Sequence, residues 1–143
     1  MIVPDTNLLV FAYDSTARHH IAARRWWEQS LAGVEPVGVP WVVVLPFTRL
    51  LTHSTICERP VTVAEVEAIV GEWLAQPQVR LLVPTGDTLQ LFFRLLQQAG
   101  AGGNLSTDAL IAAQAIEYAG VVCSNDRDFG RFPGLRCQNP LVA

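Results

Sequence analysis

With 143 residues, half of them apolar, the chain is long enough to bury a sizeable core as one domain spanning residues 1–143. Charged residues make up only 16%, which excludes a disordered chain. The net charge of -3, with Arg as the only basic side chain besides His, excludes a protein that coats nucleic acid through bulk positive charge but leaves a local binding site open.

The cysteines and the apolar runs exclude further kinds of site and protein. The three cysteines lack the CxxC spacing of zinc sites and redox motifs, and an odd number without a signal peptide fits a reducing cytoplasm. The longest apolar run, residues 37–51, is interrupted by two prolines and an arginine, so no membrane span is expected.

The chain opens with a short apolar run that ends at a carboxylate. Residues Met1–Val3 are apolar, Pro4-Asp5-Thr6 follows, and apolar residues resume at helical spacing from Asn7 to Tyr13. This pattern predicts a strand, an acidic turn and a helix. Taken alone, Asp5 fits either a helix cap or a ligand-binding residue at the carboxyl end of a strand.

Residues 17–31 carry apolar side chains at helical spacing between charged ones, which predicts an amphipathic helix. Adjacent residues point about 100° apart on a helix, so His19 and His20 near its start are not expected to share a metal ion. The predicted inward face consists of Ile21, Ala22, Trp26 and Leu31.

A short strand, Val37–Val39, precedes a segment of mixed signals, Trp41–Ser54. Its first residues are typical of strands, whereas its second half has helical spacing. We predict a helix with an irregular start, because Pro46 would kink a helix that began at Trp41. Thr62 then caps a further helix, whose predicted inward face is Val63, Val66, Ile69, Val70, Trp73 and Leu74.

The second half of the chain continues this alternation. A strand at Val79–Val83 precedes a helix at Asp87–Gln98, with a predicted inward face of Leu89, Phe92, Phe93 and Leu96. After a glycine-rich loop, Thr107 is predicted to cap the helix Asp108–Ala119, which is apolar nearly all round and therefore central. The last predicted elements are a buried strand and an edge strand, Val121–Ser124 and Leu135–Cys137.

This order of elements places the chain in the α/β class. Strands that alternate with helices form parallel sheets whose two faces are both covered. We therefore predict a three-layer α/β/α sandwich with a central, mainly parallel sheet and no internal repeats.

Three aspartates lie at the ends of predicted elements. Asp5 follows the first strand, Asp126 follows the strand Val121–Ser124, and Asp108 begins the most apolar helix. The carboxyl ends of parallel strands share one edge of a sheet, so all three can reach one crevice. Structural roles also stay open. Asp108 in a first turn would stabilise the helix dipole, and Asp126-Arg127-Asp128 would form a turn with a local ion pair.

Carboxylates gathered in one crevice repel each other, so they either take up protons or bind a cation. No His or Cys lies at these turns, and an all-oxygen ligand set suits Mg²⁺ or Mn²⁺ rather than zinc. Such an ion lowers the pKa of a bound water and stabilises charge on a phosphoryl oxygen, so hydrolysis of a phosphodiester is the expected chemistry. Asn7 and Ser124 would orient the acids or the water.

Residues 4–9, 104–113 and 124–129 read PDTNLL, NLSTDALIAA and SNDRDF. In their order and spacing, these segments resemble the signature blocks of PIN-domain ribonucleases, particularly the VapC toxins of bacterial toxin–antitoxin pairs. The resemblance implies an endoribonuclease dependent on Mg²⁺ or Mn²⁺ that cuts structured RNA, often transfer or ribosomal RNA, and is silenced by a VapB-type antitoxin. It also implies catalytic roles for Asp5, Asp108, Asp126 and Asp128, metal ligation by the first three, and supporting roles for Thr6, Asn7 and Ser124.

The chain departs from the family pattern at one position. PIN domains usually carry a further acid, mostly Glu, on the helix after the second strand, and Pro46 occupies the aligned position here. A second metal ion would then require Asp128 as a substitute ligand. Arg49, at a basic position common in the toxin subfamily, would contact RNA phosphate or form a structural ion pair.

The missing acid motivates an alternative from another class, a catalytically weakened PIN domain that acts as a protein-binding or RNA-binding module. A small-molecule phosphatase ranks last, because the chain has no specific phosphate-binding loop. The tryptophans bear on partners: their number indicates a homodimer face and an antitoxin groove, unless they simply fill the core. They are Trp26, Trp27, Trp41 and Trp73.

Overall fold

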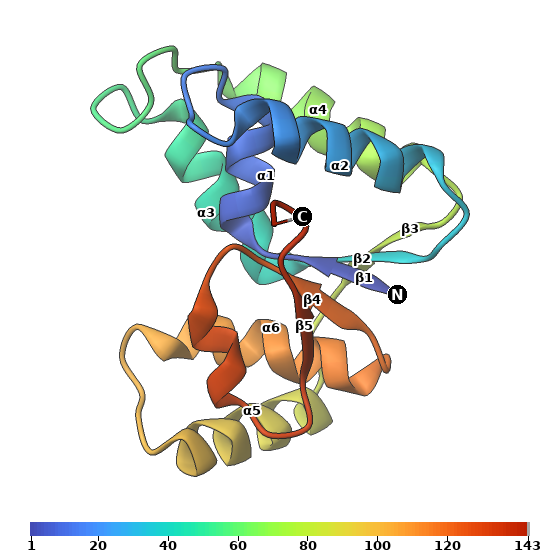
Figure 1. The fold of residues 1–143 in the computed structure, drawn as a ribbon, viewed down its shortest axis with the longest axis vertical. Helices are drawn as coiled ribbons and strands as arrows, with labels where there is room; N and C mark the ends of the chain where they lie inside the picture. Colours follow the sequence, from blue (N-terminus) through green and yellow to red (C-terminus); the bar gives the residue numbers. More distant parts are fainter. Residues whose placement is uncertain (143) are drawn as a thin grey trace.

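A five-stranded parallel sheet forms the centre of the protein in the computed structural model, which describes residues 1–142 (Figure 1). Every pair of neighbouring strands is parallel. The strands lie in the order β3-β2-β1-β4-β5 and comprise β1 (Ile2–Pro4), β2 (Val37–Pro40), β3 (Val79–Leu82), β4 (Val121–Cys123) and β5 (Arg136–Gln138).

Helices cover both faces of this sheet, which confirms the predicted three-layer α/β/α sandwich (Figure 1). On one side lie α1 (Thr6–Tyr13), α2 (His20–Ala32) and α4 (Val63–Ala75), with α3 (Trp41–Thr52) packed beside α1. On the other side α5 (Gly86–Ala99) packs along α6 (Leu105–Glu117). A short 3₁₀ helix, η1 (Arg127–Arg131), connects β4 to β5.

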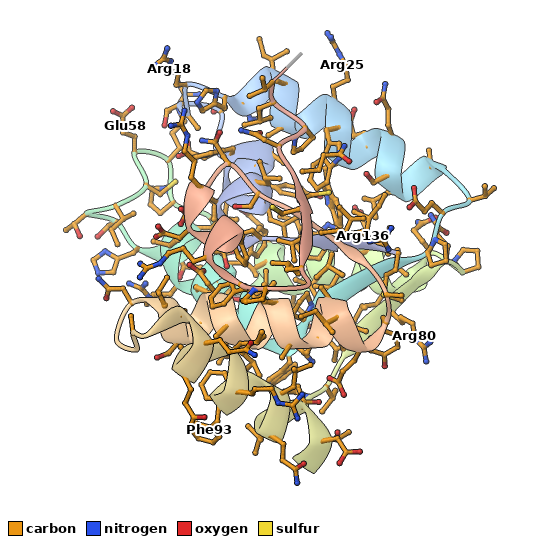
Figure 2. The ribbon with its side chains drawn as sticks, turned by 60° about the horizontal axis from the view of Figure 1, so that its bottom comes forward. Arg18, Arg25, Glu58, Arg80, Phe93 and Arg136 are labelled. Carbon is orange, nitrogen blue, oxygen red and sulfur yellow. The ribbon has the colours of Figure 1, made fainter. Side chains whose placement is uncertain are left out.

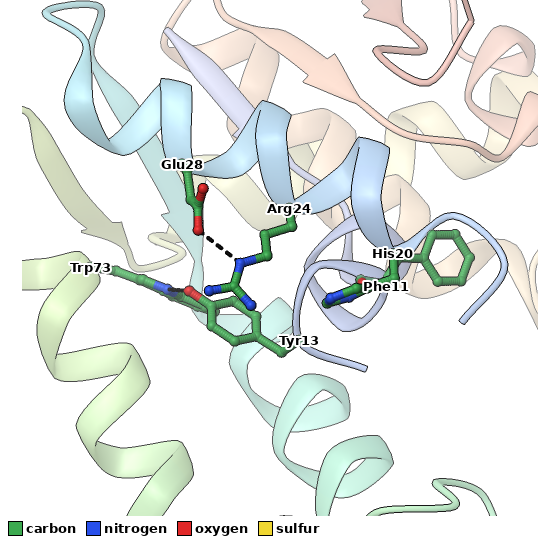
Figure 3. Close-up of polar contacts among 6 residues, drawn as sticks. All are labelled: Phe11, Tyr13, His20, Arg24, Glu28 and Trp73. Atoms are coloured by element: carbon green, nitrogen blue, oxygen red, sulfur yellow. Dashed lines mark hydrogen bonds and ion pairs between the residues drawn. The ribbon is translucent and has the colours of Figure 1, made fainter. Parts of the chain in front are cut away.

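An aromatic cluster fills the core between α1, α2, α3 and α4. The Trp27 and Trp73 rings meet edge to face with their centroids 5.3 Å apart, and Phe47 lies 4.9 Å from Trp73. The Trp73 indole Nε1 donates a hydrogen bond of 2.8 Å to the Tyr13 hydroxyl (Figure 3). Trp27 and Trp73 therefore fill the core, which is the alternative that the sequence left open for the tryptophans, whereas Trp41 is 49% exposed.

One polar contact of α2 lies within the helix and another joins its start to α1 (Figure 3). Arg24 Nε donates to Glu28 Oε1 over 2.8 Å, one turn apart along the solvent-facing side of α2. His20 Nδ1 lies 2.8 Å from the Phe11 carbonyl oxygen, which ties the start of α2 to α1. His19 caps α2 without a side-chain hydrogen bond, so the two histidines have separate structural roles.

The inward faces of two helices were predicted only in part. The predicted residues Trp26 and Leu31 of α2, and Phe92 and Leu96 of α5, pack against the core. In α2 the buried residues are Ala23, Trp27 and Ser30, while Ile21 is 73% exposed. In α5 the buried residues are Thr88 and Leu95, while Phe93 is 58% exposed and projects away from the ribbon (Figure 2). Each helix carries two adjacent aromatic residues about 100° apart, and the packing partner rather than the sequence period decides which one turns inward.

The boundaries of several elements also differ from the sequence-based predictions. Helix α3 is helical from Trp41 onward, with Pro46 inside it, rather than irregular at its start. Helix α6 begins at Leu105 after Asn104, so Thr107 lies in its first turn and is not the cap. In α4 the predicted cap at Thr62 is present, as part of a capping box with Glu65, but Val63 and Leu74 are exposed instead of buried.

Cys123 on β4 is a core residue, and burial raises the pKa of its thiol to about 12. Such a thiol is inert at neutral pH. In residues 1–142 none of the helices combines the length and the apolar character that crossing a bilayer requires.

Candidate active site

The candidate site lies at the carboxyl edge of the sheet, where β1 and β4 end side by side. The parallel register pairs Pro4 with Cys123, and the Asp5 amide donates to the Cys123 carbonyl oxygen over 2.9 Å. The residues that follow the two strands, Asp5 and Ser124, are therefore neighbours although 119 positions separate them. The strand pairing thus creates the site.

Hydrogen bonds fix the Asp5 carboxylate, which is 5% exposed. Its Oδ1 accepts from the Thr6 amide over 2.7 Å, as the N-cap of α1, and its Oδ2 accepts from the Ser124 hydroxyl over 2.7 Å. The same hydroxyl oxygen accepts from the Asp126 amide over 2.8 Å. Ser124 therefore couples the turn after β1 to the turn after β4, and Asp5 is both a helix cap and a site residue.

This coupling yields a stability prediction. We expect Ser124→Ala to lower the free energy of unfolding at pH 7 by about 1–2 kcal/mol, because Asp5 Oδ2 and the Asp126 amide both lose their partner. Urea denaturation measures this change. Ser54→Ala is the control, since the exposed Ser54 makes no side-chain hydrogen bond within residues 1–142. Equal stability of the two variants would contradict the coupling role of Ser124.

Three carboxylates converge beside Asp5. Asp108, Asp126 and Asp128 each offer an oxygen atom, and these atoms all lie within 4.8 Å of one another. Asp108 reaches the cluster from the first turn of α6, and Asp126 caps η1 by accepting the Asp128 amide over 2.9 Å. That capping bond folds Asp128 back toward the site, so two acids separated by one residue face the same point.

Loss of solvent and nearby negative charges raise the pKa values of two acids of the site. Burial raises the pKa of Asp108 to about 7, and the charges of Asp5, Asp126 and Asp128 add to the rise. Burial also raises the pKa of Asp5, although the hydrogen bonds from Ser124 and Thr6 oppose this shift. A divalent cation would relieve this repulsion, and the all-oxygen donor set fits a hard cation such as Mg²⁺ or Mn²⁺.

The acids open into a cleft of about 440 Å³. One wall is polar and consists of Asp5, Thr6, Asn7, Thr107, Asp108 and Asp126. The opposite wall comes from α3 and consists of Val42, Leu45, Pro46, Arg49 and Leu50. Arg49 is therefore the only charged residue of the α3 wall, which contains no acid.

The structure brings all the predicted site residues to this edge of the sheet. Thr6, Asn7 and Arg49 line the cleft with three of the acids, while Ser124 lies behind Asp5 and Asp128 lies in the carboxylate cluster. Sequence reasoning missed Thr107 and the apolar part of the α3 wall. Thr107 precedes Asp108 directly, but we predicted it as a helix cap and therefore gave it no place in the site.

Comparison with known proteins gives consistent matches over the whole chain. The PIN domain family matches residues 2–135. Ribonuclease VapC37 of Mycobacterium tuberculosis is 38% identical over 140 residues, which cover 98% of this chain and 97% of the relative. Ribonuclease VapC33 of the same species is 36% identical over 141 residues, with 99% of both chains covered.

Solved structures share the fold at lower sequence identity. Mycobacterium tuberculosis VapC20, described as a Sarcin-Ricin loop cleaving toxin, aligns with a TM-score of 0.70 at 19% identity and covers 95% of this chain and 99% of that one. VapBC2 from Rickettsia felis, bound to a DNA fragment from its promoter, aligns with a TM-score of 0.69 at 20% identity and covers 97% and 98%.

Proposed function

The chain belongs to the PIN domain family, with VapC ribonucleases as its relatives, and we propose that it is a VapC-type toxin. In this proposal a single PIN domain, residues 1–143, acts in the cytoplasm as an endoribonuclease dependent on Mg²⁺ or Mn²⁺. It hydrolyses phosphodiester bonds in structured RNA, either tRNA or rRNA. The observation that carries the proposal is the cluster of three carboxylates, with oxygen atoms within 4.8 Å of one another, beside the buried Asp5.

Asp5, Asp108 and Asp126 would hold the cation, with Asp128 as the fourth acid. When bound, a divalent cation supplies a water of lowered pKa and stabilises negative charge on a phosphoryl oxygen. The chain itself orients the acids, since Thr6 and Ser124 fix the two oxygens of Asp5 and each oxygen keeps a second lone pair. Arg49, across the cleft, would bind an RNA phosphate and hold the strand against the acids.

The proposal includes two protein partners. A VapB-type antitoxin would inhibit the chain, as the toxin–antitoxin complexes among the related structures support, such as VapBC from Salmonella typhimurium. A second copy of the chain would form a homodimer, for which the exposed apolar side chains Trp41 and Leu45 on α3 are available. Both lie at the same end of the sheet as the cleft, and Leu45 lines it.

One observation favours the alternative function, a weakened PIN domain that only binds RNA or protein. The α3 wall of the cleft presents Pro46 where the family usually has an acid, so this wall offers no carboxylate to a second metal ion. A binding module would need no metal, whereas the proposed nuclease does. Metal uptake therefore separates the two functions.

We expect isothermal titration calorimetry to show that the purified chain binds Mn²⁺, and that Asp128→Asn weakens the binding by about 10- to 100-fold. The physical reason is that Asp128 supplies one of the three carboxylate oxygens that lie within 4.8 Å of one another. Asp87→Asn, an exposed acid in the first turn of α5, is the control and should bind like the unaltered chain.

In the same preparation, Mn²⁺ should activate cleavage of purified tRNA or rRNA, EDTA should stop it, and the cognate antitoxin should inhibit it. If the chain binds RNA but not Mn²⁺, the nuclease function is wrong and the binding module is the supported function.

A further inference from the structure

Asp126 lies between two pockets, and only one of them is the acid cleft. The second pocket has a volume of about 240 Å³ and is lined by the turn after β4, η1 and the residues at the end of β5. Its polar lining includes Asn125, Arg127, Gln138 and Asn139. Because Asp126 lines both pockets, they are adjacent, and an RNA strand bound over the acids can extend into the second one.

The amide groups in this pocket have a fixed orientation. The Leu141 backbone amide donates to Asn139 Oδ1 over 3.0 Å, so Asn139 must turn its Nδ2 toward Asn125. Asn139 Nδ2 then donates to Asn125 Oδ1 over 2.9 Å. Asn125 Nδ2 is left with two N–H donors and no acceptor within residues 1–142. The Leu141 backbone amide thus sets the orientation of both side-chain amides, and Asn125 presents N–H donors to a ligand in the pocket.

Unpaired positive charge flanks the acids on both sides. Two ion pairs are present in residues 1–142, between the amino terminus and Glu35 and between Arg24 and Glu28. Neither includes Arg49, which lines the acid cleft, or Arg127, which lines the second pocket. An arginine without an acid partner is well suited to a phosphate, because its planar guanidinium can form two hydrogen bonds with it.

We propose that the second pocket is a subsite for the nucleotide adjacent to the scissile phosphate. Arg127 binds the phosphate of this nucleotide, and Asn125 Nδ2 donates to a carbonyl oxygen of its base. Guanine, uracil and cytosine carry such an oxygen, so they are preferred over adenine, which has none. This inference rests on the proposed ribonuclease function. The pocket volume equals that of about eight water molecules, which suffices for a nucleobase, and unpaired RNA exposes its base edges for such contacts.

The base contact is tested with a pool of RNA of randomised sequence, cut by the full chain in Mn²⁺ and analysed by sequencing the new ends. At one position next to the cut, we expect adenine to be at least threefold rarer than each of guanine, uracil and cytosine. Asn125→Asp keeps an acceptor for Asn139 but removes both donors, so it should abolish or reverse this preference at that position alone. Asn125→Ala should abolish it as well. Unchanged base preferences in both variants would overturn the assignment.

The phosphate contact is tested by fluorescence anisotropy with a fluorescein-labelled RNA 12-mer of random sequence. Arg127→Ala should weaken binding by about tenfold and reduce the slope of log affinity against log salt by about 0.7, as expected for one contact to single-stranded RNA. Arg131→Ala is the matched control, because Arg131 is exposed on the same η1 but does not line the pocket. Equal effects of the two substitutions would overturn the role of Arg127.

These measurements separate this inference from the function on which it rests. If the unaltered chain cuts RNA while the variants at Asn125 and Arg127 behave like it, the subsite is wrong and the nuclease stands. If the chain does not cut RNA but Arg127→Ala still weakens binding, the nuclease is wrong and the pocket is an RNA-binding site. If RNA neither binds nor is cut, both are wrong.

Discussion

Asp126→Asn should reduce the rate of RNA cleavage by about 10³-fold and abolish growth inhibition when the chain is expressed in bacteria. Asp126 lines both pockets and belongs to the carboxylate cluster, so its charge acts at the centre of the site. Losing about 4 kcal/mol of charge stabilisation in the transition state corresponds to this factor. Asparagine keeps the carbonyl oxygen that accepts the Asp128 amide, so the turn at η1 is preserved.

Two further variants make this result interpretable. Asp5→Asn should cause a comparable loss, because it removes the buried charge while Thr6 can still donate to the side-chain oxygen. Asp87→Asn should retain full activity, since Asp87 lies in the first turn of α5, away from the cluster. Assays with purified protein, tRNA and Mn²⁺ measure all three rates. Undiminished cleavage by both the Asp5 and Asp126 variants would mean that the chemistry takes place elsewhere.

The convergence of these acids could be predicted because it follows from topology. Asp5 and Asp126 each follow a parallel strand, and parallel strands place their carboxyl ends at one edge whatever the details of side-chain packing. The closeness of Asp128 depends on a capping hydrogen bond of 2.9 Å inside η1, which the spacing of the two acids permits but does not dictate. The position of an acid on a strand end is therefore more predictable than its exact neighbours.

The orientation of the helices was less predictable, and adjacent aromatic residues are the reason. Trp26-Trp27 and Phe92-Phe93 each allow two inward faces that differ by about 100°. In α2 the choice is made by Trp73, which meets the Trp27 ring from α4, a helix far away in sequence. Local periodicity contains no information about such a partner. The same limit explains why Phe93, which we predicted to be buried, lies on the surface.

The amide pair in the second pocket shows a third kind of limit. Asn125 and Asn139 are 14 positions apart, and nothing in either local sequence indicates that they share a hydrogen bond. They meet because β5 pairs with β4 in a register that sets Cys123 opposite Gln138. Predicting the contact between these two amides therefore required the register, whereas predicting the convergence of Asp5, Asp108 and Asp126 required only the order of strands and helices.

The second large effect concerns Asp108 and the stability of the protein without metal. The pKa of Asp108 is about 7 in the folded state, against 3.8 for an ordinary aspartate. Between these two pH values, the folded state binds more protons than the unfolded state. The free energy of unfolding therefore falls as the pH rises, and this loss is complete above about pH 7. Asp108→Asn removes this loss. The variant should therefore be more stable than the unaltered chain at pH 8.

We expect this gain to be about 1–2 kcal/mol, or about 5 °C in melting temperature, because Asp108 is half-exposed and solvent weakens the repulsion. At pH 4 the two proteins should differ little. Mn²⁺ should reverse the order at pH 8, since the cation stabilises the intact cluster and the variant has lost a ligand. Thermal melts at both pH values, with and without Mn²⁺, measure this, and Asp87→Asn should follow the unaltered chain throughout. A destabilised Asp108→Asn protein in EDTA at pH 8 would show that Asp108 serves the fold rather than the metal.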